Sequence, residues 1–190
     1  MVALASADQD VFGGAIRVWI PEGFTDVSQV RDVPDHQTVF ARPETDESIS
    51  IEILETPADH ADENPAQFHF HTLAEDNEAH ESAITSFETP QSPDLPNIMP
   101  PATVSIAIGI QRAAKFQEHA LNTVNVHVAV IRLADASTDV LISYNHPVEL
   151  ADDSSSRTLA RARPVPSDVA LSNFRNVLKS FRIVDYGLFS

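Results

Sequence analysis

Residues 11–40 read VFGGAIRVWIPEGFTDVSQVRDVPDHQTVF, and this stretch sets the pattern of the fold. Over residues 15–20, every second side chain is a β-branched hydrophobic one, namely Ile16, Val18 and Ile20. Such alternation predicts a strand with one buried face. The pair Gly13-Gly14 before it predicts a tight turn, because glycine adopts positive φ without a Cβ clash. A second extended segment, residues 37–40, follows an acidic connection that we expect to lie exposed at a sheet edge.

Four further segments alternate apolar and other residues with the period of a strand: residues 49–54, 104–110, 124–130 and 140–144. The short gap at residues 134–137 predicts a hairpin between the last two. Because no long helix separates the last three segments, we expect them to pair antiparallel.

Two helices are predicted. Asn64 and Pro65 combine a good N-cap with a proline at the first helical position. An apolar face follows, made of Phe70, Leu73 and Ala74, and His69 is expected to point away from it. Ser167 is expected to cap the second helix, whose apolar residues recur at helical spacing: Leu171, Phe174, Leu178 and Phe181.

These patterns predict an α+β fold, in which helices cover a mainly antiparallel sheet of about five to seven strands. Residues 1–10 lack periodicity and are expected to form a flexible N-terminus. Residues 11–190 are expected to form a single domain. Residues 89–101 contain five prolines, which excludes a helix or an interior strand and predicts a surface loop.

The charge is strongly uneven along the chain. The net charge is −16, yet residues 1–100 hold 20 acidic residues against three arginines, a balance of −17, and residues 101–190 have a balance of +1. An acidic surface repels nucleic acids and anionic membranes and attracts basic partners. The chain has no cysteine, which excludes disulfides and favours a reducing compartment.

Motifs for catalysis or nucleotide binding are absent from the sequence. It contains no phosphate-binding glycine motif and no G-x-S-x-G nucleophile motif. His69 and His71 lie in a histidine-rich region, but side chains two residues apart on a helix point roughly 200° away from each other, so they are not expected to share a metal ion. We therefore expect no cofactor, no metal and no covalent catalysis.

Several motifs carry a family resemblance. FGGAI at residues 12–16 is followed by P-x-G-F-x-D-x-S and by R-x-VPD-x-Q-x-VF. In this order they are similar to the opening of the Ran guanine nucleotide release factors, the Mog family. The similarity returns at residues 49–55, 67–77, 129–145 and 184–189. The resemblance implies an α/β/α sandwich like that of the PsbP proteins. It also implies that the protein binds the small GTPase Ran and promotes guanine nucleotide release in support of nuclear protein import.

The resemblance further implies a site, because the family's acidic Ran-binding surface lies at the VPD-x-Q motif. We expect Asp35 to pair with basic residues of Ran and Arg31 and Gln37 to orient the loop. The acidic residues expected to help are Asp26, Glu52 and Glu55. Thr38 stands where the family usually has an acidic residue, so one carboxylate of this surface is missing. Without the resemblance, the preferred interpretation of Asp35 is a residue that caps a turn or helix by hydrogen-bonding its own backbone.

Two alternatives stay open at this stage. An acidic adaptor of the same fold, binding another basic protein without promoting nucleotide release, fits the charge asymmetry equally well. A hydrolase or metal enzyme built around the histidines fits poorly. We expect a protein partner, no nucleic acid or membrane binding, and a monomer that acts in the nucleus and cytoplasm.

Overall fold

The computed structural model describes residues 7–28, 33–60, 63–91, 94–114, 119–155 and 164–189. Its strands are β1 (Ala7–Val11), β2 (Ile16–Ile20), β3 (Thr25–Asp26), β4 (Gln37–Arg42), β5 (Glu47–Glu55), β6 (Glu81–Glu88), β7 (Thr103–Ala114), β8 (Leu121–Leu133), β9 (Thr138–Glu149) and β10 (Arg182–Ile183). Its α-helices are α1 (Pro65–Asp76) and α3 (Ser167–Ser180), and its 3₁₀ helices are η1 (Phe12–Gly14), η2 (Ala58–His60), η4 (Ala134–Ala136) and η5 (Tyr186–Phe189).

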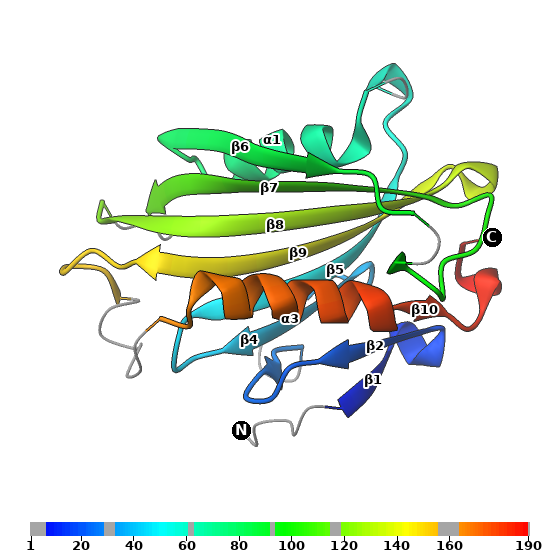
Figure 1. Ribbon diagram of the computed structural model, residues 1–190, viewed down its shortest axis with the longest axis horizontal. Coiled ribbons are helices and arrows are strands. Elements are labelled where there is room, and N and C mark those ends of the chain that lie inside the picture. Colours follow the sequence, from blue (N-terminus) through cyan, green and yellow to red (C-terminus); the bar gives the residue numbers. More distant parts are fainter. Residues whose placement is uncertain are drawn as a thin grey trace.

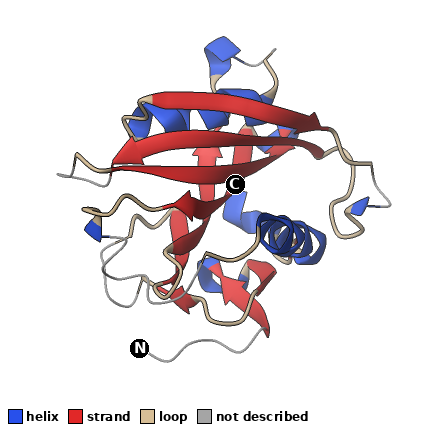
Figure 2. Cartoon of the chain, turned by 60° about the vertical axis from the view of Figure 1, so that its left-hand side comes forward, coloured by secondary structure: helices blue, strands red, loops and turns tan. Residues whose placement is uncertain are grey.

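The strands form two antiparallel sheets (Figures 1 and 2). The larger one has seven strands in the order β3-β4-β5-β9-β8-β7-β6, and the smaller one has the order β1-β2-β10. The predicted hairpin at residues 134–137 is confirmed, since it joins β8 to β9. Strand β6 was not predicted. Its register shifts between Ile84 and Ser86, and this irregularity breaks the alternation that reveals a strand in the sequence.

Helices α1 and α3 cover opposite faces of the larger sheet, which confirms the expected α/β/α arrangement (Figure 1). Successive residues of β8 point to opposite faces of the sheet and belong to two separate hydrophobic cores. Val128 and Val130 pack with Phe70 of α1, whereas Ala129 and Ile131 belong to the core that contains α3. The α3 side is the larger core because the small sheet also packs there through Ile16, Val18 and Ile20 of β2, which are fully buried.

The stretch at residues 11–40 connects the two sheets, because β2 belongs to the small sheet while β3 and β4 belong to the large one. The turn before β2 is confirmed, with φ of 66° at Gly13 and 91° at Gly14. The expected flexible N-terminus is wrong for residues 7–10. They form β1 and pair with β2, so backbone hydrogen bonds hold them in place.

Of the two predicted helix N-caps, one is confirmed and one is wrong. The N-cap of α1 is confirmed, since the Asn64 side chain accepts hydrogen bonds from the amides of Ala66 and Gln67. The N-cap of α3 is wrong by one residue. Pro166 occupies the cap position, and Ser167 Oγ instead accepts a hydrogen bond of 3.3 Å from the Asn125 side chain.

The proline-rich segment is a loop, as predicted, over its described residues 89–91 and 94–102. Leu95 is buried in the core below α3 and anchors this loop to the body. Over the described part of the chain, no helix is long and apolar enough to cross a membrane.

Candidate functional site

Strands β3, β4 and β5 form one edge of the larger sheet, and the predicted site residues that the structure describes lie on these strands or just before β4. Asp35 lies in the exposed turn just before β4. The amide of Gln37 donates to the carbonyl of Pro34 (2.9 Å) and closes this turn, and the amide of Ile53 donates to the carbonyl of His36 (2.8 Å). The backbone thus holds Asp35 beside the end of β5. We call this region, residues 26–28, 34–38 and 52–55, the acidic edge.

The pairing register divides the predicted residues between the two faces of the sheet. Gln37 is the cross-strand partner of Glu52, so their side chains share one face. Asp26 is the partner of Phe40, whose side chain is buried in the core below α3, and Thr38 lies on that same face. The acidic edge therefore brings Gln37 and Glu52 together but separates them from Asp26 and Thr38.

The carboxylates of the acidic edge differ in what they contact. Asp26 Oδ1 accepts hydrogen bonds from the amide (2.8 Å) and the hydroxyl (2.6 Å) of Ser28. Glu52 accepts one of 2.9 Å from Ser50. Asp35 and Glu55 are exposed, and neither has a hydrogen-bond or ion-pair partner among the described residues. These two carboxylates are thus available to a partner. Arg31, which was predicted to orient the loop, lies outside the described residues.

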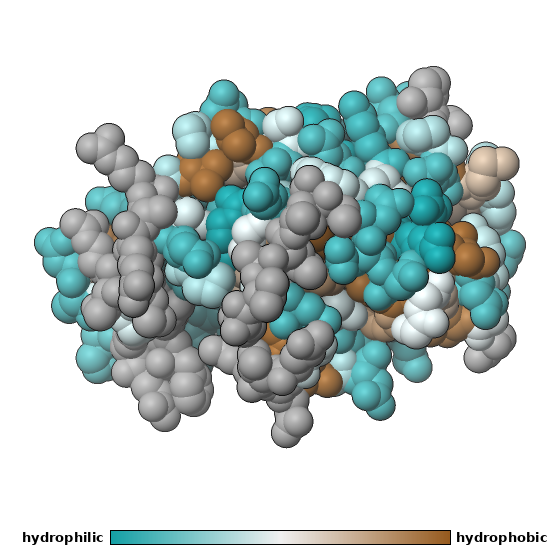
Figure 3. Space-filling view, turned by 90° about the horizontal axis from the view of Figure 1, so that it is seen from below, coloured by the Kyte–Doolittle hydropathy of each residue, from teal (hydrophilic) through white to brown (hydrophobic). Residues whose placement is uncertain are grey.

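Positive charge near the acidic edge is scarce. Residues 33–60 contain seven acidic residues and one arginine, Arg42. Its guanidinium donates to Glu47 (2.9 Å) and lies over the ring of Phe24, with Cζ 4.6 Å from the ring centroid. Figure 3 shows that hydrophilic residues make up most of the coloured surface seen from below. The acidic edge therefore keeps its negative charge and is suited to a basic partner.

A buried carboxylate, Glu47, ties the start of β5 to β9, at the end of the strand opposite Glu52 and Glu55. It accepts hydrogen bonds from the hydroxyls of Tyr144 (2.8 Å) and Thr45 (2.6 Å) and from Arg42. Burial raises the pKa of Glu47, but the contacts with His146, Thr45 and Tyr144 and the charge of Arg42 outweigh it, so the pKa lies below its usual value. This network could not be predicted from the sequence, because Glu47 and Tyr144 are 97 residues apart.

A second carboxylate, Asp139, holds the segment that follows the acidic edge. It accepts hydrogen bonds from Arg132 Nε (2.7 Å), His69 (3.0 Å) and the hydroxyl of Thr56 (3.2 Å). The expectation that His69 points away from the body is therefore wrong, since the ring is buried against β9. Thr56 directly follows Glu55, so this network fixes where β5 ends.

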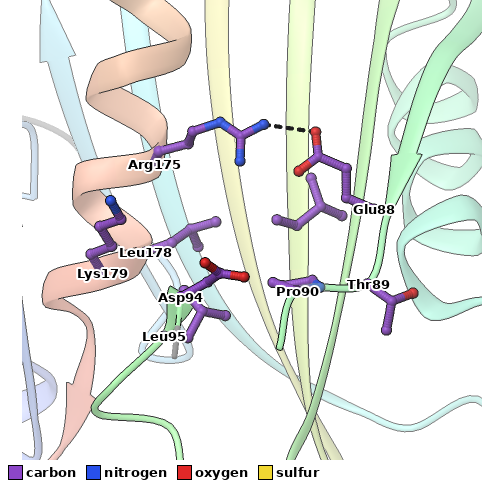
Figure 4. Close-up of a pocket in the computed structure, with 9 residues that line it drawn as sticks. Glu88, Thr89, Pro90, Asp94, Leu95, Arg175, Leu178 and Lys179 are labelled. Carbon is purple, nitrogen blue, oxygen red and sulfur yellow. Dashed lines mark hydrogen bonds and ion pairs between the residues drawn. The ribbon is translucent and has the colours of Figure 1, made fainter. Parts of the chain in front are cut away.

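A hollow of about 310 Å³ lies between α3 and the loop after β6 (Figure 4). Arg175 and Lys179 of α3 lie on one side of it, and Glu88 and Asp94 lie across from them. Arg175 Nη2 is 2.7 Å from Glu88 Oε1, so part of this charge is already paired. The hollow therefore carries both signs of charge and does not select a basic partner as the acidic edge does.

The histidines do not form a metal centre within the described ranges, where no three His, Asp or Glu side chains are arranged to hold an ion. The ring of His69 is hydrogen-bonded to Asp139. His71, two residues further on, is exposed on the outer side of α1.

Comparison with known proteins extends over nearly the whole chain. Residues 9–147 match the family described as Ran-interacting Mog1 protein. The probable ran guanine nucleotide release factor of Dictyostelium discoideum is 35% identical over 185 residues, which cover 95% of each chain. The Ran guanine nucleotide release factor of Danio rerio is 36% identical over 183 residues, which cover 94% of this chain and 97% of that protein.

A solved structure agrees with these relatives. The crystal structure of the Saccharomyces cerevisiae Ran-binding protein Mog1p superposes with a TM-score of 0.70 and 27% identity, covering 98% of this chain and 100% of that one. The resemblance drawn from the motifs at residues 12–40 is thus confirmed. The chain belongs to the family of Ran-interacting Mog1 proteins.

Proposed function

We propose that this protein binds the small GTPase Ran and promotes release of its guanine nucleotide, supporting nuclear protein import. The observation that carries the proposal is similarity along nearly the whole chain to relatives named as Ran guanine nucleotide release factors. The Saccharomyces cerevisiae and Schizosaccharomyces pombe relatives are both named as nuclear import proteins. On that basis we assign this protein to the nucleus and cytoplasm. We also propose that it acts as a monomer.

The mechanism follows from linkage. A small GTPase of this kind holds its nucleotide through a phosphate-binding loop, a lysine and Mg²⁺. A partner that binds the nucleotide-free form more tightly weakens nucleotide binding by the same factor. The protein therefore acts as a regulator and forms no covalent intermediate with its partner.

The acidic edge supplies the groups for this contact. Asp35 and Glu55 are exposed and without a partner among the described residues, so binding Ran through them breaks no internal ion pair. Glu52 and Gln37 lie side by side on one face and offer a carboxylate beside an amide. Asp26 and Thr38 extend the contact to the other face of the sheet. The predicted role of Arg31 in orienting the loop is kept as part of the proposal.

The test is the release of a fluorescent guanine nucleotide from purified Ran, with and without this protein. We expect the unaltered protein to accelerate release and Asp35→Lys to lose at least about tenfold of that acceleration, because like charges then face each other. Glu75→Lys is the matched control. It makes the same charge change on the exposed side of α1, near its C-terminus, where a lysine is tolerated.

Each outcome is informative. Acceleration that depends on Asp35 but not on Glu75 supports the proposal and the site together. Acceleration that Asp35→Lys leaves intact contradicts the site, whereas binding without any acceleration contradicts the nucleotide-release function.

A further inference from the structure

A second hollow, of about 410 Å³, opens at the tip of the β8–β9 hairpin. Three segments that are far apart in the sequence line it: the proline-rich loop at residues 99–102, the hairpin at residues 133–136 and the C-terminal η5. Figure 1 shows the hairpin tip and the C-terminus at the same end of the molecule. We call this cavity the tip hollow.

The lining of the tip hollow is mostly apolar, and part of it is unusually exposed. Met99 is 65% exposed and Tyr186 is 57% exposed, whereas Leu133 at its inner wall is buried. Large exposed apolar side chains around a concave site are typical of an interaction surface. The volume lies within the range of about 300–1,000 Å³ found for pockets that take small ligands. A single aromatic or aliphatic side chain therefore fits it.

One carboxylate gives the tip hollow its charge. Asp135 is exposed, lines the hollow, and has no ion-pair partner among the residues that the structure describes. None of the other residues that line the hollow is charged. The occupant that this chemistry favours is an apolar side chain next to a basic one.

The hairpin that lines the tip hollow lies beside one end of the acidic edge. The amide of Thr56 donates to the carbonyl of Ser137 (2.8 Å), and Glu55 is the cross-strand partner of Thr138. Neighbouring strands lie about 5 Å apart, so the hairpin tip separates the hollow from Glu55 by little more than one strand. The two surfaces are therefore within reach of one partner segment.

We propose that the tip hollow receives an aromatic or long aliphatic side chain from the segment of Ran whose basic residues contact the acidic edge. The inference rests on the proposed function and adds to it an apolar anchor. Charge at the acidic edge then steers and orients Ran, while burial in the tip hollow slows its dissociation. A basic protein without an apolar side chain at the matching position makes only the charge contacts. The tip hollow therefore favours Ran over such proteins.

The test measures the Kd of the protein for Ran by titration calorimetry at low and high salt. The double variant Met99→Ala/Tyr186→Ala truncates two exposed side chains that line the tip hollow. Phe87→Ala removes another exposed aromatic side chain, on strand β6, and is the control. All three side chains are about half exposed or more, so little stability is expected to be lost. Thermal unfolding of each variant checks that it is folded, and Met99→Ala alone serves if the double variant is not.

We expect the double variant to raise the Kd by about tenfold at both salt concentrations, because the lost contact is apolar. Phe87→Ala is expected to stay within about twofold of the unaltered protein, which is a fraction of 1 kcal/mol. If the unaltered protein binds Ran and the folded variants bind equally well, the anchor is overturned while the proposed function stands. If the unaltered protein does not bind Ran at all, both proposals are overturned.

Discussion

Nε2 of His69 lies 3.0 Å from Oδ2 of Asp139, which joins α1 to strand β9 across 70 residues of sequence. Arg132 donates to the same carboxylate through Nε at 2.7 Å and Nη2 at 2.8 Å. Burial of Asp139 opposes its ionisation, but the hydrogen bonds and charges of Arg132 and His69 outweigh burial and lower its pKa to about 2. Asp139 therefore stays charged inside the fold and holds the hairpin, α1 and the end of β5 together.

Replacing Asp139 is expected to destabilise the protein strongly. Asp139→Asn removes the negative charge from a buried ion pair with Arg132, and breaking such a pair costs about 3–5 kcal/mol. The measurement is urea unfolding near pH 7, with Glu75→Gln on the exposed side of α1 as the control. A loss no larger than that of the control contradicts this role.

The same carboxylate predicts how stability changes in acid. Its folded pKa of about 2 lies below the ordinary 3.8, so the stabilisation is fully present above about pH 4 and is lost as pH falls toward 2. The difference corresponds to about 2 kcal/mol. Between about pH 4 and pH 2, the free energy of unfolding is expected to fall by about 2 kcal/mol less in Asp139→Asn than in the unaltered protein. An unchanged slope contradicts the assignment.

His127 governs a different pH window. Burial, together with the charges of His146 and Arg175, lowers its pKa from 6.5 to about 4. Between these values the unfolded chain binds a proton that the folded protein excludes, so stability falls as pH falls from about 6.5 to 4. The full effect is about 3 kcal/mol.

His127→Phe tests this directly. The ring of His127 stacks on Phe174 at a centroid distance of 5.3 Å, and its Nδ1 has no hydrogen-bond partner within the described residues. A phenyl ring keeps the stacking and removes the titration, so the pH dependence between 6.5 and 4 is expected to flatten. His71→Phe, at an exposed position of α1, is the control and is expected to keep the dependence. Equal slopes in both variants rule out His127 as the source.

Gly109 allows α1 to approach the sheet closely. A Cβ at this position meets the carbonyl oxygen of Ala83 at 2.4 Å and Cζ of Phe70 at 2.5 Å. Gly109→Ala is therefore expected to lower the free energy of unfolding by about 1–3 kcal/mol, as overpacking does. If the contact with Phe70 is the cause, Phe70→Leu costs less in the Gly109→Ala background than in the unaltered protein. Additive costs contradict that cause.

Most of the helices and strands could be predicted, because the patterns that reveal them involve residues only a few positions apart in the sequence. The alternation in β7 and β8 and the Asn64 cap are signals of this kind. The burial of His69 could not be predicted, because its partner Asp139 is 70 residues away. Strand β6 was missed for a local reason, since its register shift breaks the alternation.

The candidate site was predicted in part. The strand at residues 37–40 could be predicted, and so could the acidic connection before it. The described residues of both lie at the acidic edge. Gln37 and Thr38 point to opposite faces because side chains alternate along any strand. The pairing of Gln37 with Glu52 depends on the register of β4 on β5, which the sequence does not specify by itself. The tip hollow was missed because it is assembled from three distant segments.

Thr38 offers a gain-of-function test of the acidic edge. Its side chain is half-buried on the same face as Asp26, at the position where the family resemblance implies an acidic residue. Thr38→Glu adds a carboxylate on the face of Asp26, two residues along β4 from its partner Phe40. It is expected to tighten Ran binding and speed nucleotide release by up to about tenfold, or about 1.4 kcal/mol. Thr38→Gln has nearly the same size without the charge and is the control. We expect the gain to shrink at high salt, because added ions screen exposed charges. A gain that Thr38→Gln reproduces would show that shape rather than charge limits the contact. No gain at either salt concentration would place the Ran contact away from this face of the sheet.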